Sequence, residues 1–216
     1  GEERRRIKTG KIKPGQNFVM AVSCDGTLRS AEAAWNKELQ RRTARMTRHP
    51  VGGIEKSLDL SAESFVIDNA LGQKSIVAGY PWFCEWGRDA MIAVPGLCFY
   101  RGALKEGFEV LKTFAGRAKE GWIPNYLSDD GQHDAFNSVD ATLWFFWAVQ
   151  QYLRRDGNVA DVEKSLLPFM IESVSSVIEG RSPLLRLRDD GLVECGDENT
   201  QLTWMDAQVH GVPVTP

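Results

Sequence analysis

Apolar residues recur at the spacing of α-helices through most of the chain after residue 58. Helices are predicted over 59–71, over 88–100, where Pro95 should produce a kink, and over 139–153, which is apolar nearly all round as in a helix packed on two sides. Two further helices carry a one-sided apolar stripe, which consists of Leu104, Phe108, Leu111 and Ala115 in the first and of Val162, Leu166, Phe169 and Val174 in the second. Long loops separate these segments, so the fold class is predicted to be mainly α.

Strand patterns precede and interrupt the helices. Residues 7–24 are strand-like, and because two strands cannot make a stable sheet alone, 1–24 are interpreted as the end of a β-sandwich. Residues 72–79 are either a break or a short strand. A hairpin is predicted over 184–195, around the Asp-Asp-Gly turn at 189–191.

A linker helix is predicted between the sandwich and the helical region. Residues 30–48 are rich in Ala and Arg, contain no Gly or Pro, and begin with Ser30, whose hydroxyl can accept a hydrogen bond from the first turn. The chain is therefore expected to have three parts. These are the end of a sandwich at 1–24, a helical linker at 25–56 and a helical domain at 57–216.

Composition and charge exclude several classes of protein. The 216 residues are 43% hydrophobic and 25% charged, which is the composition of a globular protein, and no apolar run approaches the roughly 18 residues that a membrane helix needs. Residues 1–49 contain 12 Lys and Arg against 5 Asp and Glu. Acidic residues interrupt this basic arm and few aromatic residues accompany it, so nucleic acid is not the expected partner.

The four cysteines indicate a reducing compartment. They are widely scattered, with no Cys-x-x-Cys pair and no histidine at ligand spacing, at positions Cys24, Cys84, Cys98 and Cys195. This pattern argues against a zinc site or a disulfide scaffold. No apolar segment of a secretory signal follows the charged start, and no nucleotide loop or cofactor motif is present. We expect a cytoplasmic protein that uses neither metal nor cofactor.

Residues whose side chains could bind a ligand or take part in catalysis are concentrated in three loops, at 80–89, 122–140 and 196–206. In a ring of paired helices, each second connection returns to the same rim. The three loops are therefore expected to share one face of the molecule, which is where a binding site would form.

The first loop has the composition of a sugar-binding site. Trp82 and Trp86 offer flat apolar faces that match the C–H face of a pyranose, while Arg88 and Asp89 can hydrogen-bond its hydroxyl groups. A structural interpretation is also open. Asp89 could satisfy backbone N–H groups at a helix start, and Arg88 could form an ordinary ion pair with Glu85.

The other two loops carry weaker signals. Asn137 and Asp140 lie at the start of a strongly apolar helix, where either could be the N-cap, and His133 is expected on the loop surface. Asp206 closely follows Trp204. Desolvation against an apolar wall would favour the neutral carboxyl that a general acid requires, although most such residues are caps or surface groups.

Long motifs in these loops resemble the glycogen-debranching amylo-α-1,6-glucosidase family in order and spacing. They are Gly-Tyr-Pro-Trp-Phe at 79–83, Trp-Gly-Arg-Asp at 86–89, Asn-Ser-Val-Asp-Ala at 137–141, Leu-Trp-Phe at 143–145 and Leu-Thr-Trp-Met-Asp-Ala at 202–207. The resemblance runs from about residue 60 to the end, and Trp-x-Arg-Asp is also similar to glucoamylases. It implies the N-terminal part of an (α/α)6 toroid, an α-glucan partner such as glycogen or limit dextrin, and inverting hydrolysis of α-1,6-linked glucose.

The resemblance also implies roles for particular residues. Asp206 would be the general acid that protonates the glycosidic oxygen, and Arg88 and Asp89 would hold the glucose whose bond is cut. The other substrate-binding candidates are Trp82, Glu85, Trp86, Asn137, Asp140 and Trp204. Glu85 stands where the family more often has Asp, so its carboxylate reaches further.

Inverting hydrolysis also needs a general base. The family takes it from a glutamate much nearer its C-terminus, and Glu194 and Glu198 fit no base position of the family. We expect an internal fragment whose base lies beyond residue 216, which hydrolyses its substrate negligibly and can associate through exposed helix faces. Two alternatives stay open: a glucoamylase- or trehalase-like α-glucosidase, and a non-catalytic glucan-binding remnant.

Overall fold

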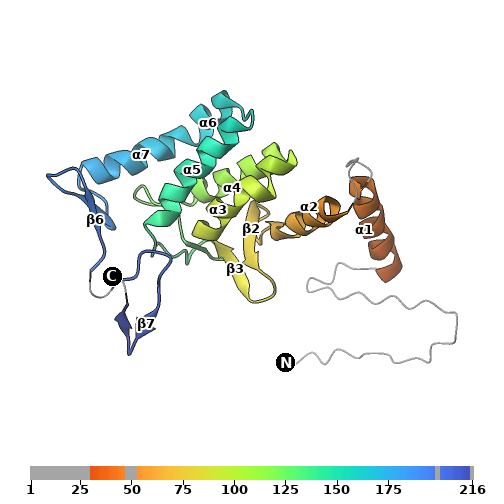
Figure 1. Ribbon diagram of the computed structural model, residues 1–216, viewed down its shortest axis with the longest axis horizontal. Helices are drawn as coiled ribbons and strands as arrows, with labels where there is room; N and C mark the ends of the chain where they lie inside the picture. The colour runs from red at the N-terminus through yellow and green to blue at the C-terminus, as the bar shows by residue number, and fades with distance from the viewer. Residues whose placement is uncertain (1–29, 47–52, 198–199, 215–216) are drawn as a thin grey trace. The chain divides into compact units, whose positions relative to one another are not determined.

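Residues 30–46, 53–197 and 200–214 are described by the computed structural model of the chain (Figure 1). Contacts divide the chain into two units, Gly1–Leu60 and Ser61–Pro216. The sandwich strands predicted for 1–24 lie outside the described residues. Helices provide most of the regular structure, so the mainly α class is confirmed.

The first unit contains the predicted linker helix. α1 (Ala31–Met46) lies within the predicted range, and the hydroxyl of Ser30 accepts a hydrogen bond from the backbone N–H of Ala33 at 3.2 Å. Hydrogen bonds from Arg41 and Arg42 lower the pKa of Glu38 to about 2. The helix begins as its sequence predicts, with a side-chain acceptor at its first turn.

The helix predicted over 59–71 is wrong at both ends. α2 (Ile54–Phe65) begins earlier and ends at Phe65, and β1 (Val66–Asp68) follows directly. β1 pairs with β2 (Lys74–Gly79), which confirms the strand alternative for 72–79. The side chain of Asn69 turns the chain between them by accepting hydrogen bonds from the N–H groups of Leu71 and Gln73. β-Branched side chains and this turn favour strand pairing over continuation of the helix.

A four-stranded antiparallel sheet supports the first of the predicted site loops. Its order is β1-β2-β3-β4, where β3 is Phe83–Trp86 and β4 is Tyr126–Leu127. Glu85 lies opposite both Val77 of β2 and Leu127 of β4. The sheet therefore joins the hairpin at 80–82 to the loop that precedes the long apolar helix.

Three helices pack together beside this sheet (Figure 1). They are α3 (Gly87–Leu97), α4 (Leu104–Gly116) and α5 (Asp140–Arg154), of which α3 and α4 contact β2. α3 contacts both of the others, and their shared core includes Met91, Phe114 and Phe145. The stripe predicted on α4 is confirmed, since Phe108 and Leu111 are buried in this core.

The end of α3 departs from the predicted pattern. α3 ends at Leu97 rather than at residue 100, and Phe99–Arg101 form a separate 3-10 turn, because Phe99 packs against Tyr152 of α5 with ring centroids 5.5 Å apart. The kink predicted at Pro95 stays a prediction. On α5, which matches its predicted range, Leu143 is 55% exposed, so part of its apolar surface has no cover among the described residues.

The single helix predicted to carry Val162 to Val174 is wrong, because the chain forms two helices there. α6 (Val159–Ser165) and α7 (Leu167–Ile178) meet at Leu166. Pro168 lies in the first turn of α7, where its missing N–H costs nothing but where it cannot continue a preceding helix. Val174 is exposed, so the predicted stripe is buried only in its first half.

Two hairpins complete the second unit. β5 (Leu185–Leu187) and β6 (Val193–Cys195) confirm the predicted hairpin, and Gly191 supplies the positive φ of +81° that its turn requires. β7 (Gln208–Val209) and β8 (Val212–Pro213) form a second, unpredicted hairpin.

Exposed apolar residues follow one face of α7. They occur at helical spacing, at Leu167, Ile171, Val174 and Ile178. Association through such faces stays a prediction. Within the part of the chain that the structure describes, no helix combines the length and apolarity needed to cross a bilayer, and no three His, Cys, Asp or Glu side chains are grouped to hold a metal ion.

Candidate active site

The junction between β3 and α3 carries the first group of candidate residues. Trp86 ends the strand and Gly87 begins the helix, and the N–H of Gly87 donates to the carbonyl of Asn125 at 2.9 Å. A Cβ atom on Gly87 would lie 2.2 Å from the carbonyl oxygen of Pro124. Only glycine fits this close approach of two backbone segments, and the next residues, Arg88 and Asp89, project from the first turn of α3.

Arg88 forms a bidentate ion pair with Asp140 at the start of α5. Its Nε donates to Oδ1 and Oδ2 at 2.9 and 2.7 Å, and its Nη2 donates to Oδ1 at 2.7 Å. The two side chains are 14% and 22% exposed. Burial opposes the charge of Asp140, but hydrogen bonds from Arg88 and Ser138 outweigh it and hold the pKa of Asp140 below its usual value. The alternative ion pair of Arg88 with Glu85 is therefore wrong.

Ser138 connects this ion pair to α5. Its hydroxyl donates to Asp140 Oδ1 at 2.6 Å and accepts hydrogen bonds from Arg88 Nη2 and from the N–H of Ala141, each at 3.1 Å. One hydroxyl thus uses its donor and both its acceptor positions. The suggestion that Asn137 or Asp140 caps this helix is wrong, since Ser138 accepts the N–H and Asn137 lies exposed beside it.

A cavity of about 310 Å³ opens beside the β3–α3 junction. The side chains around it come from β2, β3, α3 and the loop after β6, and they are Ala78, Phe83, Trp86, Arg88, Asp89 and Asp206. Sugar and cofactor sites begin at about 300 Å³, so the cavity has room for one hexose ring. It combines one indole, one further aromatic ring, a guanidinium and two carboxyl groups.

Four of the predicted site residues line this cavity, and the others do not. Trp82 and Trp204 are 84% and 70% exposed, and Asn137 is exposed as well. Asp140 reaches the cavity only through Arg88. Glu85 is only 5% exposed, and it accepts a hydrogen bond from Asn69 Nδ2 at 3.3 Å.

Asp206 is positioned by its loop rather than by an apolar wall. The carbonyl of Leu202 accepts a hydrogen bond from the N–H of Val139 at 2.9 Å, and Leu202 is buried in a small cluster with Trp122 and Leu185. This anchor brings the third predicted loop to the start of α5. Asp206 itself is exposed, so the desolvation expected beside Trp204 is not found.

Comparison with known proteins identifies the family. A family model described as amylo-alpha-1,6-glucosidase matches residues 60–216. The chain belongs to this family. It is also 37% identical over 84 residues to the protein named "Glycogen debranching enzyme" of Saccharomyces cerevisiae, an alignment that covers 37% of this chain and 5% of that relative. The chain thus spans a small share of the length of the relative that it matches.

The part of the chain that matches the amylo-alpha-1,6-glucosidase family contains the whole cavity and all nine predicted site residues. Residues that the sequence analysis did not single out also contribute. Phe83 and Ala78 line the cavity, Ser138 bridges the ion pair, and Asn125 contacts the start of α3. Ser138 and Phe83 stand within the family motifs, which was the available signal. Asn125 is 3% exposed, and although it lies in the second predicted loop, the sequence analysis did not choose it as a site residue.

His133 lies on the loop surface, as predicted. Its side chain is 81% exposed and its Nδ1 lies 2.7 Å from Oδ2 of Asp130. Hydrogen bonds from the N–H of Gln132 and from His133 hold the pKa of Asp130 well below its usual range. The pair closes a loop and does not line the cavity.

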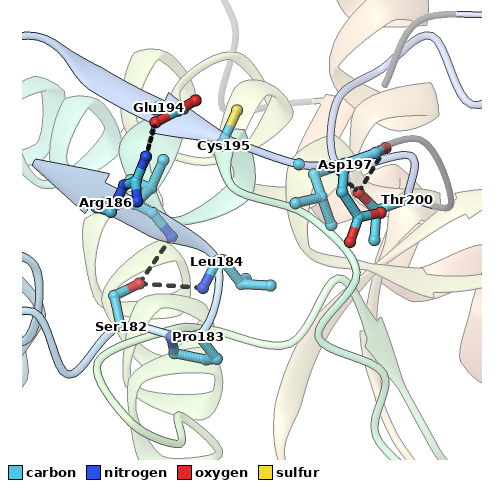
Figure 2. A pocket seen from close by; sticks show the side chains of 11 residues that line it. Ser182, Pro183, Leu184, Arg186, Glu194, Cys195, Asp197 and Thr200 are labelled. Atoms are coloured by element: carbon cyan, nitrogen blue, oxygen red, sulfur yellow. Dashed lines mark hydrogen bonds and ion pairs between the residues drawn. The ribbon is translucent and has the colours of Figure 1, made fainter. Parts of the chain in front are cut away.

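A second hollow of about 300 Å³ lies beside the β5–β6 hairpin (Figure 2). Its polar groups bond to one another: Arg186 pairs with Glu194, and Ser182 accepts hydrogen bonds from the N–H groups of Leu184 and Leu185. No aromatic residue is among its described lining residues. A sugar would find no aromatic stacking face among these residues, so the cavity beside Trp86 is the better candidate.

Proposed function

We propose that this chain is the sugar-binding part of an inverting α-1,6-glucosidase that removes glucose at branch points of glycogen or limit dextrin. The observation that carries the proposal is the cavity in which Trp86, Arg88, Asp89 and Asp206 meet. Membership of the amylo-alpha-1,6-glucosidase family supports the substrate. An α-glucan is therefore the proposed partner.

Each group in the cavity has a proposed task. The indole of Trp86 packs against the C–H face of the glucose, and the carboxylate of Asp89 accepts hydrogen bonds from its hydroxyls. Arg88 uses Nε and Nη2 for Asp140 and Ser138, while its Nη1 donates to no acceptor among the described residues and remains for the sugar. Asp206 protonates the glycosidic oxygen as the bond to the anomeric carbon breaks.

The same family assignment leads us to propose the larger architecture. The described helices would form part of an (α/α)6 toroid, preceded by a linker helix at 25–56 and the end of a sandwich at 1–24. The apolar face of α7 supports this proposal, since another helix in a ring would cover such a stripe. A sugar bound at one rim would then contact the loops at 80–89 and 196–206.

Binding of isomaltose, which contains one α-1,6 bond, tests the proposed site. We expect the chain to bind isomaltose, and Trp86→Leu to weaken that binding by about tenfold, equal to about 1.4 kcal/mol, because the stacking face is lost. The measurement is ligand-observed NMR or calorimetry. Trp147→Leu removes a partly exposed indole of α5 that is outside the cavity, and it should bind like the unsubstituted chain.

Other disaccharides separate the proposal from its alternatives. A clear preference for trehalose would favour a trehalase-like enzyme, and a preference for maltose would favour a glucoamylase-like one. No binding of any of the three sugars would contradict the proposed site.

Hydrolysis of limit dextrin tests the proposed division of tasks. An inverting enzyme needs a second carboxylate about 6.5–9.5 Å from the acid to activate water, and we assign that base to no residue of the chain. We therefore expect the 216-residue chain to release glucose at the background rate in a coupled glucose assay. Rapid glucose release that Asp206→Asn abolishes would show that the general base lies within the chain. It would overturn the proposal that the chain supplies the acid but not the base.

A further inference from the structure

Asn125 lies in the loop between α4 and α5, directly beneath the start of α3. It is 3% exposed and therefore cannot touch a ligand in the cavity. Its side-chain Oδ1 accepts a hydrogen bond from the N–H of Arg88 at 3.4 Å, and its carbonyl accepts one from the N–H of Gly87 at 2.9 Å. Its own N–H donates to the carbonyl of Ala135 at 2.8 Å.

These contacts supply what α3 lacks. The first N–H groups of a helix have no partner within the helix, and a side chain at the N-cap usually accepts one of them. Trp86 occupies the N-cap of α3 and makes no such hydrogen bond. Asn125, which is distant in sequence, accepts the N–H groups of the first two helical residues instead.

The residues on either side of Asn125 also contact the segment around Gly87. The carbonyl of Pro124 fills the space that a side chain on Gly87 would need. Tyr126 pairs with Trp86 across the sheet, and their rings meet edge to face with centroids 5.6 Å apart. Residues 124–126 therefore hold residues 86–88 in register along two backbones.

Both ends of the loop are fixed. Before Asn125, the N–H of Ile123 donates to Thr142 Oγ1 of α5 at 3.1 Å. After it, Asp134 forms an ion pair with Arg117 and accepts the N–H of Ser128. Burial opposes the charge of Asp134, but these hydrogen bonds hold its pKa below the usual value. Residues 123–126 therefore connect the start of α3, which carries Arg88, to α5, which carries Asp140.

We propose that Asn125 is a positioning residue for sugar binding. By holding the backbone of Gly87 and Arg88, it sets the guanidinium of Arg88 against Asp140 and turns its remaining Nη1 toward the cavity. That the bound ligand is a sugar rests on the proposed function. That Asn125 positions Arg88 does not depend on it, so the ligand and the positioning can be tested separately.

The test compares Asn125→Ala, which removes the acceptor of the Arg88 N–H, with Asn125→Asp, which keeps an oxygen there. We expect Asn125→Ala to weaken isomaltose binding by about tenfold, as expected when a buried partner is lost. It should also shift the Arg88 Nε–Hε signal in ¹⁵N NMR spectra toward that of a solvated arginine. Asn125→Asp should restore both readouts to within about threefold affinity and the original signal position.

The matched control is Asn158→Ala. The side chain of Asn158 also accepts a backbone N–H at a helix start, that of Ala160 at 3.0 Å, but it begins α6 outside the cavity. It should leave the Arg88 signal and isomaltose binding unchanged. If Asn125→Ala does not fold, Asn125→Ser replaces it, because the shorter hydroxyl does not reach the Arg88 N–H.

The outcomes separate the two proposals. An unchanged Arg88 signal in folded Asn125→Ala or Asn125→Ser would overturn the positioning role. So would an equal shift in Asn158→Ala. If the unsubstituted chain binds no isomaltose, but the Arg88 signal shifts as expected, the proposed function fails and the positioning of Arg88 by Asn125 stands.

Discussion

Replacing Gly87 by alanine is expected to lower the free energy of unfolding by about 3 kcal/mol, at the upper end of what overpacking costs. The new Cβ would lie 2.2 Å from the carbonyl oxygen of Pro124, and a backbone atom cannot rotate away as a side chain does. Either the end of β3 or the backbone of residues 124–126 must move. We therefore also expect isomaltose binding to be lost, because Trp86, Arg88 and Asp89 move with the junction.

Gly96→Ala is the matched control for this substitution. Gly96 belongs to the same helix, and a Cβ added there meets no atom within 4 Å. Alanine should raise the free energy of unfolding by about 0.5–1 kcal/mol, since glycine is the poorer helix former. Urea denaturation of both variants measures the difference. Equal effects of the two substitutions would contradict the close contact between Gly87 and Pro124.

Replacing Arg88 by leucine is expected to lower the free energy of unfolding by about 3 kcal/mol at neutral pH. The substitution leaves the largely buried carboxylate of Asp140 without its bidentate partner, so that it keeps only the hydroxyl of Ser138 and a backbone N–H as partners among the described residues. Isomaltose binding should fall below detection, because the guanidinium of Arg88, which lines the cavity, is lost as well. A double-mutant cycle with Asp140→Asn should give a coupling free energy of about 2 kcal/mol.

The pH dependence of this effect follows from the direction of the pKa shift. The pKa of Asp140 is lower in the folded chain than in the unfolded chain. Its contribution to stability is thus fully present above the unfolded value, about 3.9, and is lost as pH falls through the lower folded value. The difference between the unsubstituted chain and Arg88→Leu should therefore shrink in acid. A difference that grows below pH 4 would contradict the assignment.

An exposed ion pair provides the comparison. Arg181 pairs with Glu172 and Glu179 on the surface after α7. Arg181→Leu should change the free energy of unfolding far less than Arg88→Leu, because solvent screens exposed charges. It should leave isomaltose binding unchanged.

Local patterns in the sequence determined a large part of the fold. The apolar stripe of Leu104, Phe108 and Leu111 predicted α4, and the apolar run at 139–153 predicted α5. Ser30 and Gly191 predicted a helix start and a hairpin turn. Each of these signals depends on neighbours within one or two turns of the chain, which the sequence contains in full.

The sequence also determined which loops carry the chemistry, and the family comparison agrees with the motifs found there. It could not determine the pairing of their charges. Arg88 lies three residues from Glu85 and 52 from Asp140, yet it pairs with Asp140. Glu85 belongs to β3, where its side chain is buried. Arg88 belongs to α3, and its side chain bonds to Asp140 at the start of α5.

Only the tertiary structure decided how the start of α3 is held. Neither Asn125 nor the contact of Pro124 with Gly87 leaves a periodic or local signal, because the partners belong to different loops. The division of α6 from α7 and the strand at Val66–Asp68 differ in this respect, because Pro168 and the turn at Asn69 are local signals that the apolar helical pattern concealed. Spacing along a chain encodes which face of an element is apolar. The partner that covers that face, or neutralises a charge on it, depends on how distant segments pack.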